Sequence, residues 1–236
     1  MAEEKSFTPA LGNAKLTPLY DLAIAGLTRE RTWRERLVQA VDPQPGETIL
    51  DVGCGTGSLI TRLKDASPQS HLVGVDPDEE VLARARRKAS KLGQEIEWHL
   101  GFLTPKLAQK LAPVDKVVSS LVFHQTPVVE KRRILETMLS VLKEGGSLHI
   151  ADYGLQRTRL MRILFRLTVQ AIDGVEDTTT NAQGKLPEYM RDAGFVDVYE
   201  LRVVPTVTGS ISIYGGSMQV ASSHVGSALR PVSQNV

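Results

Sequence analysis

Three glycines at alternate positions, Gly53, Gly55 and Gly57, follow the apolar segment 49–52 and precede an apolar helix start at Leu59. This order predicts a buried strand, a sharp turn and a helix. Glycine permits such a turn, and it lets a ligand approach main-chain atoms that a Cβ would shield. We therefore expect the segment from residue 51 to residue 57 to be a ligand-binding loop.

The glycine spacing bears on which ligand the loop binds. The dinucleotide fingerprint Gly-x-Gly-x-x-Gly would need glycine at position 58, where this chain has Ser58. The spacing of Asp51, Gly53, Gly55 and Gly57 is a different pattern. A nucleotide-cofactor oxidoreductase on a similar sheet therefore remains an alternative, but Ser58 speaks against it.

A second acidic residue supplies a partner for a nucleoside. The apolar segment 71–75 predicts a second strand, and Asp76 follows it, about 20 residues beyond the glycine loop. A carboxylate in this position can accept two hydrogen bonds from a ribose diol. The alternative is that Asp76 merely precedes a helix capped by Asp78. The loop and the acid together favour a ribose-containing ligand.

Strands alternate with amphipathic helices along most of the chain. Strands are expected at 48–52, 71–75, 96–100, 116–121, 147–152, 196–204 and 206–214, helices among others at 158–172 and 186–193, and a polar loop at 174–184. The alternation predicts an α/β fold with a doubly wound, Rossmann-like seven-stranded sheet, mostly parallel, with helices on both faces and an antiparallel last strand. At 236 residues and 42% hydrophobic content, the chain fits one principal domain at 42–214, with a helical cap at 1–41 and a flexible tail at 215–236.

These motifs resemble those of class I S-adenosylmethionine-dependent methyltransferases over roughly residues 16 to 214. Within that class the chain is most similar to the ubiquinone/menaquinone-biosynthesis C-methyltransferases. The closer likeness depends on Leu19-Tyr20-Asp21-Leu22 followed by Trp33-Arg34-Glu35-Arg36-Leu37, and on the segment 142–148 before the fifth strand. The resemblance implies S-adenosyl-L-methionine as the cofactor. The two helices expected before the first strand either cover an edge of the sheet or, with Tyr20 and its neighbours, close over the methyl donor.

The resemblance also assigns the cofactor site. Its residues are Asp51, Gly53, Cys54, Gly55, Gly57, Asp76, Pro77, Gly101, Phe102 and Ser119. Asp51 and the backbone of the first two loop glycines would contact the methionine moiety, Asp76 the ribose and Pro77 the adenine. The family commonly has an acid where this chain has Phe102, so the adenine would be held by main-chain groups and by packing on Phe102 or Leu103.

On the acceptor side, His124 follows the fourth strand and is the candidate catalytic residue. An unperturbed imidazole pKa of about 6.5 suits a base at neutral pH, although a structural histidine beside Phe123 is the alternative. Methyl transfer from a sulfonium needs no covalent intermediate, so Cys54 is not expected to be a nucleophile. The remaining histidines have no metal-ligand spacing, and no metal is expected.

The helix expected at 158–172 combines apolar residues with an arginine stripe and is a candidate lid within 155–185. Its composition suits a lipophilic acceptor, such as a quinone precursor, a phenol or a lipid amine, and peripheral contact with a membrane. An ordinary buried helix or a homodimer face are the alternatives. The chain lacks an Asn/Asp-Pro-Pro-aromatic motif after the fourth strand, and its basic run 84–88 fits a solvated helix face, so no nucleic-acid partner is expected.

The net charge and the cysteine content limit the partners and the cellular compartment that we expect. The formal net charge is +1, so no overall field would draw the protein to nucleic acid. Cys54 is the single cysteine, which fits a reducing compartment, and without an apolar span or a signal sequence at the start we expect a cytoplasmic enzyme. A small-molecule methyltransferase is favoured over the oxidoreductase and over a non-catalytic S-adenosylmethionine-binding module.

Overall fold

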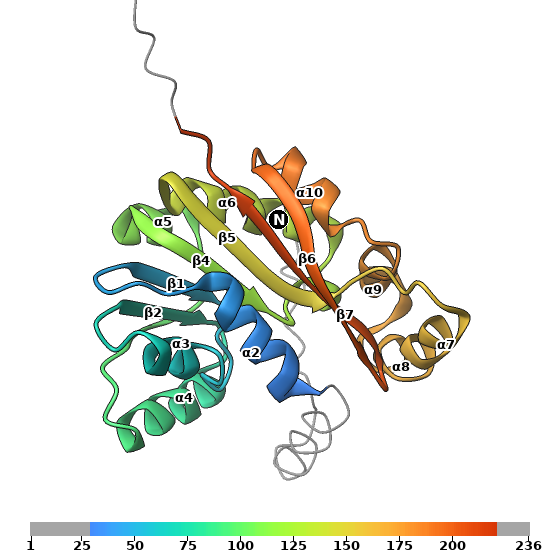
Figure 1. Cartoon of the computed structure of the whole chain (residues 1–236), viewed down its shortest axis with the longest axis horizontal. Coiled ribbons are helices and arrows are strands. Elements are labelled where there is room, and N and C mark those ends of the chain that lie inside the picture. Colours follow the sequence, from blue (N-terminus) through green and yellow to red (C-terminus); the bar gives the residue numbers. More distant parts are fainter. Residues whose placement is uncertain (1–28, 221–236) are drawn as a thin grey trace, which may run out of the picture.

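The computed structural model describes residues 29–220, which form one seven-stranded sheet with helices on both faces (Figure 1). The strands are β1 Thr48–Val52, β2 His71–Asp76, β3 Glu97–Leu100, β4 Val114–Ser120, β5 Leu142–Tyr153, β6 Val196–Thr206 and β7 Gly209–Ser217. The helices are α2 Glu30–Val41, α3 Ile60–Ala66, α4 Glu79–Lys91, α5 Pro105–Leu111, α6 Val128–Val141, α7 Arg159–Leu167, α8 Val169–Asp173, α9 Val175–Ala182 and α10 Leu186–Asp192, with a 3-10 turn, η1, at Phe123–Gln125.

The strand order in the sheet is β3-β2-β1-β4-β5-β7-β6. The first five strands are parallel to their neighbours, whereas β7 pairs antiparallel with both β5 and β6. The prediction of a mostly parallel sheet with an inserted antiparallel last strand is therefore confirmed. The order reverses between β1 and β4, and in such sheets ligands bind outside the carboxyl ends of the strands at this point.

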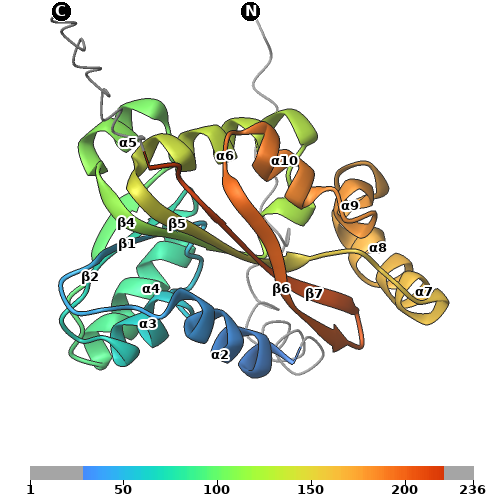
Figure 2. The same cartoon turned by 45° about the horizontal axis from the view of Figure 1, so that its top comes forward.

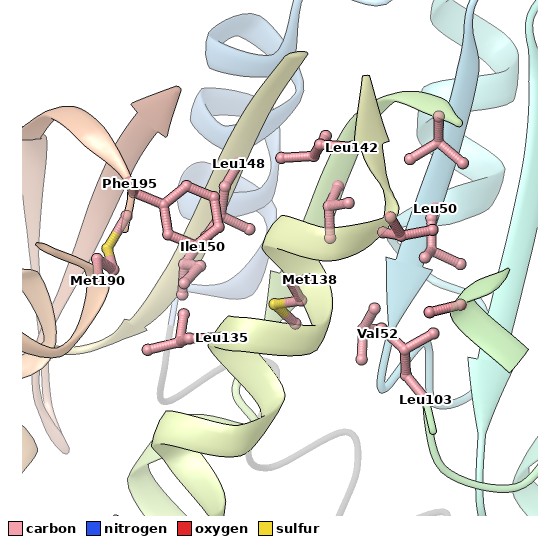
Figure 3. Packing of buried hydrophobic residues seen from close by; sticks show 14 of the residues in the cluster. Leu50, Val52, Leu103, Leu135, Met138, Leu142, Leu148, Ile150, Met190 and Phe195 are labelled. Carbon is pink, nitrogen blue, oxygen red and sulfur yellow. The ribbon is translucent and has the colours of Figure 1, made fainter. Parts of the chain in front are cut away.

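Two hydrophobic clusters fill the space on either side of the sheet. Helices α5, α6 and α10 cover one face, and α2, α3 and α4 lie on the other (Figure 2). On the first face, Leu135 and Met138 of α6 pack over Leu148 and Ile150 of β5 (Figure 3). The segment α7 to α9 extends beyond the end of β5, so it can contribute to the site without covering the centre of the sheet (Figure 2).

The alternation of side chains along β1 determines on which face of the sheet Asp51 lies. Side chains alternate between the two faces of a strand, and Leu50 and Val52 belong to the cluster under α6. Ile49 belongs to the opposite cluster, with Trp33 of α2. Asp51 therefore lies on the face of the sheet that α2 and α3 cover.

The structure corrects several expected elements. The segment 174–184 is not a polar loop, because Val175–Ala182 forms α9. The helix expected at 158–172 is divided at Thr168 into α7 and α8, and Phe165 and Val169, on the two sides of this break, are both buried. Strand β5 begins at Leu142 and not at residue 147, and β7 extends through Ser217 into the expected tail. Helix α5 was not expected at all.

Some predictions lie outside the described residues. These are the first cap helix, with Tyr20, and the part of the tail beyond residue 220. The second cap helix is confirmed as α2, while the division into cap, principal domain and lid stays a prediction. Within residues 29–220, every helix is too short or too polar to cross a membrane.

Candidate active site

The glycine loop turns sharply after β1. Gly53 and Cys54 both donate main-chain hydrogen bonds to Val75 O of β2, at 2.9 and 3.1 Å. Gly53 has a φ of 72°, and a Cβ there would lie 2.3 Å from Val122 Cγ2. Gly55 has a φ of 54°, but a Cβ there would meet no atom within 4 Å. The first glycine is therefore needed for packing against the loop after β4, and the second lies where a ligand can reach the backbone.

Asp76 is tied to the glycine loop. Its Oδ2 accepts a hydrogen bond from Gly55 N at 2.8 Å, and its Oδ1 accepts one from Asp78 N at 3.0 Å. Burial raises the pKa of this carboxyl, and the two main-chain donors oppose that effect. Asp78 caps α4 by accepting from Val81 N at 3.1 Å. Asp78 is therefore the N-cap of α4, as the alternative reading of Asp76 supposed. Asp76 nevertheless faces the glycine loop, as its assignment to the ribose requires.

Asp51 is the most unusual group at the site. It is fully buried, and neither carboxylate oxygen has a hydrogen-bond partner among residues 29–220. Burial raises its pKa to about 7, the charge of Arg34 opposes that rise, and Asp76 adds to it. A buried carboxylate without partners is costly unless a cation or donor meets it. This unpaired acceptor therefore fits a ligand that brings an ammonium group to the position of Asp51.

The adenine side of the expected site contains Gly101, Phe102 and Pro77. Gly101 N donates to Asp76 O at 2.9 Å, which brings the end of β3 to the end of β2. Phe102 is 60% exposed, whereas Leu103 is buried in the core cluster with Leu50. Of the two side chains expected to pack on adenine, only Phe102 is accessible. Pro77, which directly follows Asp76 in the chain, is half-buried.

Ser119 and Cys54 support the loop from within. The Ser119 hydroxyl is completely buried and donates to Val52 O at 2.8 Å, so it fixes the end of β1. Cys54 is a buried free thiol whose pKa is raised by burial. A thiol held neutral in this way is a poor nucleophile, which agrees with the expectation that Cys54 does not act as one.

On the acceptor side, His124 lies in η1 between two carboxylates. Its Nδ1 is 2.9 Å from Asp152 Oδ1, and its Nε2 is 3.5 Å from Asp173 Oδ2. The ring also packs edge-on against Tyr153, with the ring centroids 5.0 Å apart. Burial favours the neutral imidazole, but the two carboxylates outweigh it and raise the pKa of His124 to about 9. The expectation of an unperturbed pKa near 6.5 was wrong, because Asp152 and Asp173 could not be placed beside His124 from the sequence.

A buried lysine holds the wall of this region. Lys131 of α6 is fully buried, and its Nζ donates to Asp177 O, Thr180 Oγ1 and Asn181 Oδ1 of α9 at 2.7 to 2.8 Å. Asn181 Nδ2 in turn donates to Tyr153 O at 3.1 Å. Burial lowers the pKa of Lys131 to about 8, and the charges of Asp152 and Asp177 oppose that shift. Helix α9 is thereby fixed to α6 and to the end of β5.

Sequence reasoning missed Lys131, Asp152 and Arg34 at this site. Lys131 shares the helical spacing of Leu135 and Met138, so its place on a buried stripe was a usable signal. Asp152 ends a buried strand, as Asp76 does. No group of three or more metal-ligating side chains occurs within the described part of the chain. His71 and His99 instead contact Glu97 at 3.2 and 2.6 Å, on the exposed side of β2 and β3.

Comparison with known proteins agrees with this geometry. A family profile described as "Methyltransferase domain" matches residues 49–146, from β1 to the start of β5. The demethylmenaquinone methyltransferase of Thermus thermophilus is 28% identical over 214 residues, which are 80% of this chain and 93% of that protein. The arsenite methyltransferase of Halobacterium salinarum is 34% identical over 110 residues, 46% of this chain and 27% of that protein.

Among solved structures, the magnesium protoporphyrin IX methyltransferase of Synechocystis, with bound SAH, has a TM-score of 0.61. It is 19% identical, over 89% of this chain and 90% of that one, and this likeness concerns the fold. Three curated relatives are 30 to 34% identical to this chain in the matched regions. This chain covers only 27%, 34% and 59% of their own lengths.

The sheet order, the glycine loop and Asp76 define a Rossmann-like methyltransferase domain. The profile match over residues 49–146 and the relatives support a class I S-adenosylmethionine-dependent methyltransferase. S-Adenosylmethionine is the cofactor of this class, and its hydroxyl and ammonium groups match the carboxylate acceptors present. A ribose can meet Asp76, and an α-ammonium can meet Asp51, whose carboxylate is buried without a partner among residues 29–220.

Proposed function

We propose that this protein transfers the methyl group of S-adenosylmethionine to a small lipophilic acceptor, namely a quinone precursor, a phenol or a lipid amine. The observation that carries the proposal is the apolar outer face of α7, in the segment that follows β5 on the acceptor side of the site. The name of the Thermus relative, a demethylmenaquinone methyltransferase that this chain spans over 93% of its length, supports the quinone class.

Helix α7 presents three different faces. Phe165 is buried against the core, while Leu160, Ile163 and Leu167 are 65%, 54% and 70% exposed. These three recur at spacings of three and four residues and so form one row on the helix. Arg159, Arg162 and Arg166 are exposed along the adjacent side. An exposed apolar row beside arginines is suited to the boundary of an anionic membrane, where a lipophilic acceptor would be held.

S-Adenosylmethionine supplies an activated, electrophilic methyl group. The protein's own task is to align the acceptor and exclude water, which can contribute several kcal/mol through proximity. The loop glycines and Asp76 fix the donor side, and the region of η1, β5 and α9 forms the acceptor side. The Lys131 contacts with α9 make that side a rigid wall rather than a loose loop.

His124 is the residue to which we assign chemistry on the acceptor. Its Nδ1 hydrogen-bonds Asp152 at 2.9 Å, whereas Nε2 lies 3.5 Å from Asp173 Oδ2, a longer contact that a hydroxyl of the acceptor can replace. Since its pKa is raised to about 9, the ring carries a proton at neutral pH. An imidazolium there stabilises the ionised form of a phenol or quinol, so a larger fraction of the acceptor is the nucleophilic anion, and the proton that the acceptor loses passes to solvent. We assign this role to protonated His124 in place of the role of a neutral base.

Methyl turnover tests the proposal. Labelled S-adenosylmethionine is supplied with a panel of acceptors: demethylmenaquinol, a catechol, a simple phenol, phosphatidylethanolamine and arsenite. We expect label in the quinol or phenol products, and none from arsenite, because soft arsenic binds thiolates and the one cysteine of this chain is buried. Binding of S-adenosylhomocysteine without turnover of any acceptor would favour the non-catalytic module, and stabilisation by NAD instead would favour the oxidoreductase.

Membrane contact is tested separately, by co-sedimentation with vesicles with and without anionic lipid. The wild type is expected to bind anionic vesicles, and the Ile163→Ser/Leu167→Ser variant to bind them at least tenfold less. Leu92→Ser is a matched control, since Leu92 is 55% exposed at the end of α4, outside the α7 row. Equal binding by all three proteins, or none, would contradict the membrane assignment. A dimer lost in the double variant would identify the row as a subunit interface instead.

A further inference from the structure

The polar contacts of α9 converge on one charged group, the ammonium of Lys131. This side chain of α6 is fully buried. Its Nζ donates hydrogen bonds to three oxygens of α9, which are Asp177 O, Thr180 Oγ1 and Asn181 Oδ1, at 2.8, 2.8 and 2.7 Å. Burial lowers the pKa of Lys131 only to about 8, so the ammonium keeps its three donors at neutral pH. All three are used on α9, and none is left for a substrate.

Asn181 connects this contact to one side of the His124 ring. Its Nδ2 donates to Tyr153 O at 3.1 Å. The ring of Tyr153 packs edge-on against His124. Tyr153 N also donates to Asp152 Oδ1 at 2.7 Å, and this is the oxygen that His124 Nδ1 contacts. A shift of α9 would therefore move Tyr153 and disturb the groups that orient the imidazole.

Helix α8 makes a second connection, on the other side of the ring. Helices α8 and α9 lie side by side beyond the end of β5 (Figure 2). Gln170 Nε2 of α8 lies 3.2 Å from Thr178 Oγ1 and 3.3 Å from Thr179 Oγ1 of α9. Asp173, the last residue of α8, is the group that lies 3.5 Å from His124 Nε2. The position of Asp173 thus also depends on α9.

Helix α9 has few apolar contacts that could fix it instead. Its two buried side chains, Thr178 and Asn181, are polar, and its one large apolar side chain, Val175, is 62% exposed. Hydrophobic burial therefore contributes little to the position of α9, and the ammonium contacts determine it. We propose that Lys131 is a positioning residue for methyl transfer. It fixes α9, and through α9 it holds both sides of the His124 ring and so aligns the acceptor.

This inference rests on the proposed function, and it separates the two sides of the site. The hydrogen bonds of Lys131 reach the acceptor side through α9 and do not involve the glycine loop. Loss of the ammonium should therefore impair turnover and leave cofactor binding intact. An acceptor displaced by about 1 Å can react about 100-fold more slowly, so a small movement of α9 is enough to be measured.

The test compares Lys131→Met with a matched control, Lys116→Met. Lys116 of β4 also ties two segments together, because its Nζ donates to Glu47 Oε2 at 2.7 Å and to Asp42 O at 2.9 Å. It lies in the first half of β4, whereas η1 follows the other end of that strand. Turnover is measured with labelled S-adenosylmethionine and demethylmenaquinol, or with the catechol if the wild type methylates it faster. Calorimetry gives the affinity for S-adenosylhomocysteine, and all assays are run well below the unfolding temperature of each protein.

Lys131→Met should lower kcat/KM for the acceptor roughly 10- to 100-fold, through a lower kcat as well as a higher acceptor KM. Its affinity for S-adenosylhomocysteine should change less than about threefold, since one misaligned side of the site does not alter the other. Amide hydrogen exchange in α9 should become faster in this variant. Lys116→Met should leave turnover, affinity and the exchange of α9 unchanged.

Several results would overturn the proposal. A parallel loss of turnover and cofactor affinity in Lys131→Met would mean that Lys131 only supports the fold. Unchanged kcat/KM, or unchanged exchange in α9, would remove it from the acceptor side. If Lys131→Met does not fold, Thr180→Val, which removes one of the three oxygens, must lower kcat/KM without weakening S-adenosylhomocysteine binding, and any other outcome refutes the inference. A wild type that methylates no acceptor would overturn the proposed function together with it.

Discussion

Replacing Asp51 with asparagine removes a buried charge without changing the shape of the side chain. The pKa of Asp51 is about 7 in the folded protein, against an ordinary value of 3.8. The folded state therefore holds a proton that the unfolded state has lost between about pH 4 and pH 7, and the free energy of unfolding falls as the pH rises through that window. A difference of about 3 between the two pKa values corresponds to about 4 kcal/mol at pH 8, as an upper limit.

Asp51→Asn lacks this penalty, so its unfolding free energy relative to the wild type should rise between pH 4.5 and pH 8 by about 2 to 4 kcal/mol. The assay is urea unfolding of both proteins at the two pH values without cofactor. Asp42→Asn is the control, because Asp42 is exposed at the end of α2 and keeps the left-handed φ of 44° that asparagine tolerates. A pH-independent difference between Asp51→Asn and the wild type would refute the assignment of a strained, unpartnered carboxylate.

The remaining predictions concern the two sides of the site. Asp76→Ala should weaken S-adenosylhomocysteine binding by one to two orders of magnitude in calorimetry, because charge-assisted bonds of about 1.5–3 kcal/mol are lost; unchanged affinity would remove Asp76 from the ribose site. His124→Gln should destabilise the protein most at pH 6 and by about 3 kcal/mol less at pH 10. The reason is that the pKa of His124 is raised from 6.5 to about 9, so its stabilising charge is lost through that range. An equal loss of stability at both pH values in denaturant unfolding would contradict the pairing of His124 with Asp152 and Asp173. Gly55→Ala should fold with a loss of about 1–2 kcal/mol in the free energy of unfolding, yet weaken cofactor binding at least tenfold. Gly53→Ala should destabilise the protein more, because its Cβ would lie 2.3 Å from Val122. The reverse order of stability in thermal unfolding would contradict the loop geometry.

The sheet and the loop were predictable because their signals are local. Alternating apolar strands and amphipathic helices determine a doubly wound sheet, and the glycine spacing and Asp76 lie within about 25 residues of each other in a single βαβ unit. The antiparallel last strand followed from two adjacent strand patterns at the end of the chain. In these cases the local propensity, the hydrophobic period and the global fold agree.

Helix α9 could not be predicted in the same way. Its sequence, Val175-Glu176-Asp177-Thr178-Thr179-Thr180-Asn181-Ala182, is polar and has three threonines, which favour strands and turns over helices. It forms next to Lys131, whose ammonium binds three of its oxygens across 46 to 50 residues of sequence. A tertiary contact thus overrides the local preference.

The raised pKa of His124 has a similar origin. Asp152 and Asp173 are 28 and 49 positions away in the chain, and only the fold brings their oxygens to the two ring nitrogens. From the sequence alone His124 has no recognisable charged partner, so an ordinary imidazole pKa is expected for it. Arg34 was recognisable as part of a Trp-Arg pair, but its effect on Asp51 depends on how α2 packs against the sheet.

The most direct test of the account is a calorimetric titration of the wild-type protein with S-adenosylhomocysteine at pH 6.5, repeated in two buffers of different ionisation enthalpy. The account predicts one site per chain and release of a fraction of a proton to the buffer, because an ammonium beside Asp51 lowers the raised pKa of that carboxyl. NAD should not bind. Absence of S-adenosylhomocysteine binding, or binding of NAD in its place, would contradict the central claim.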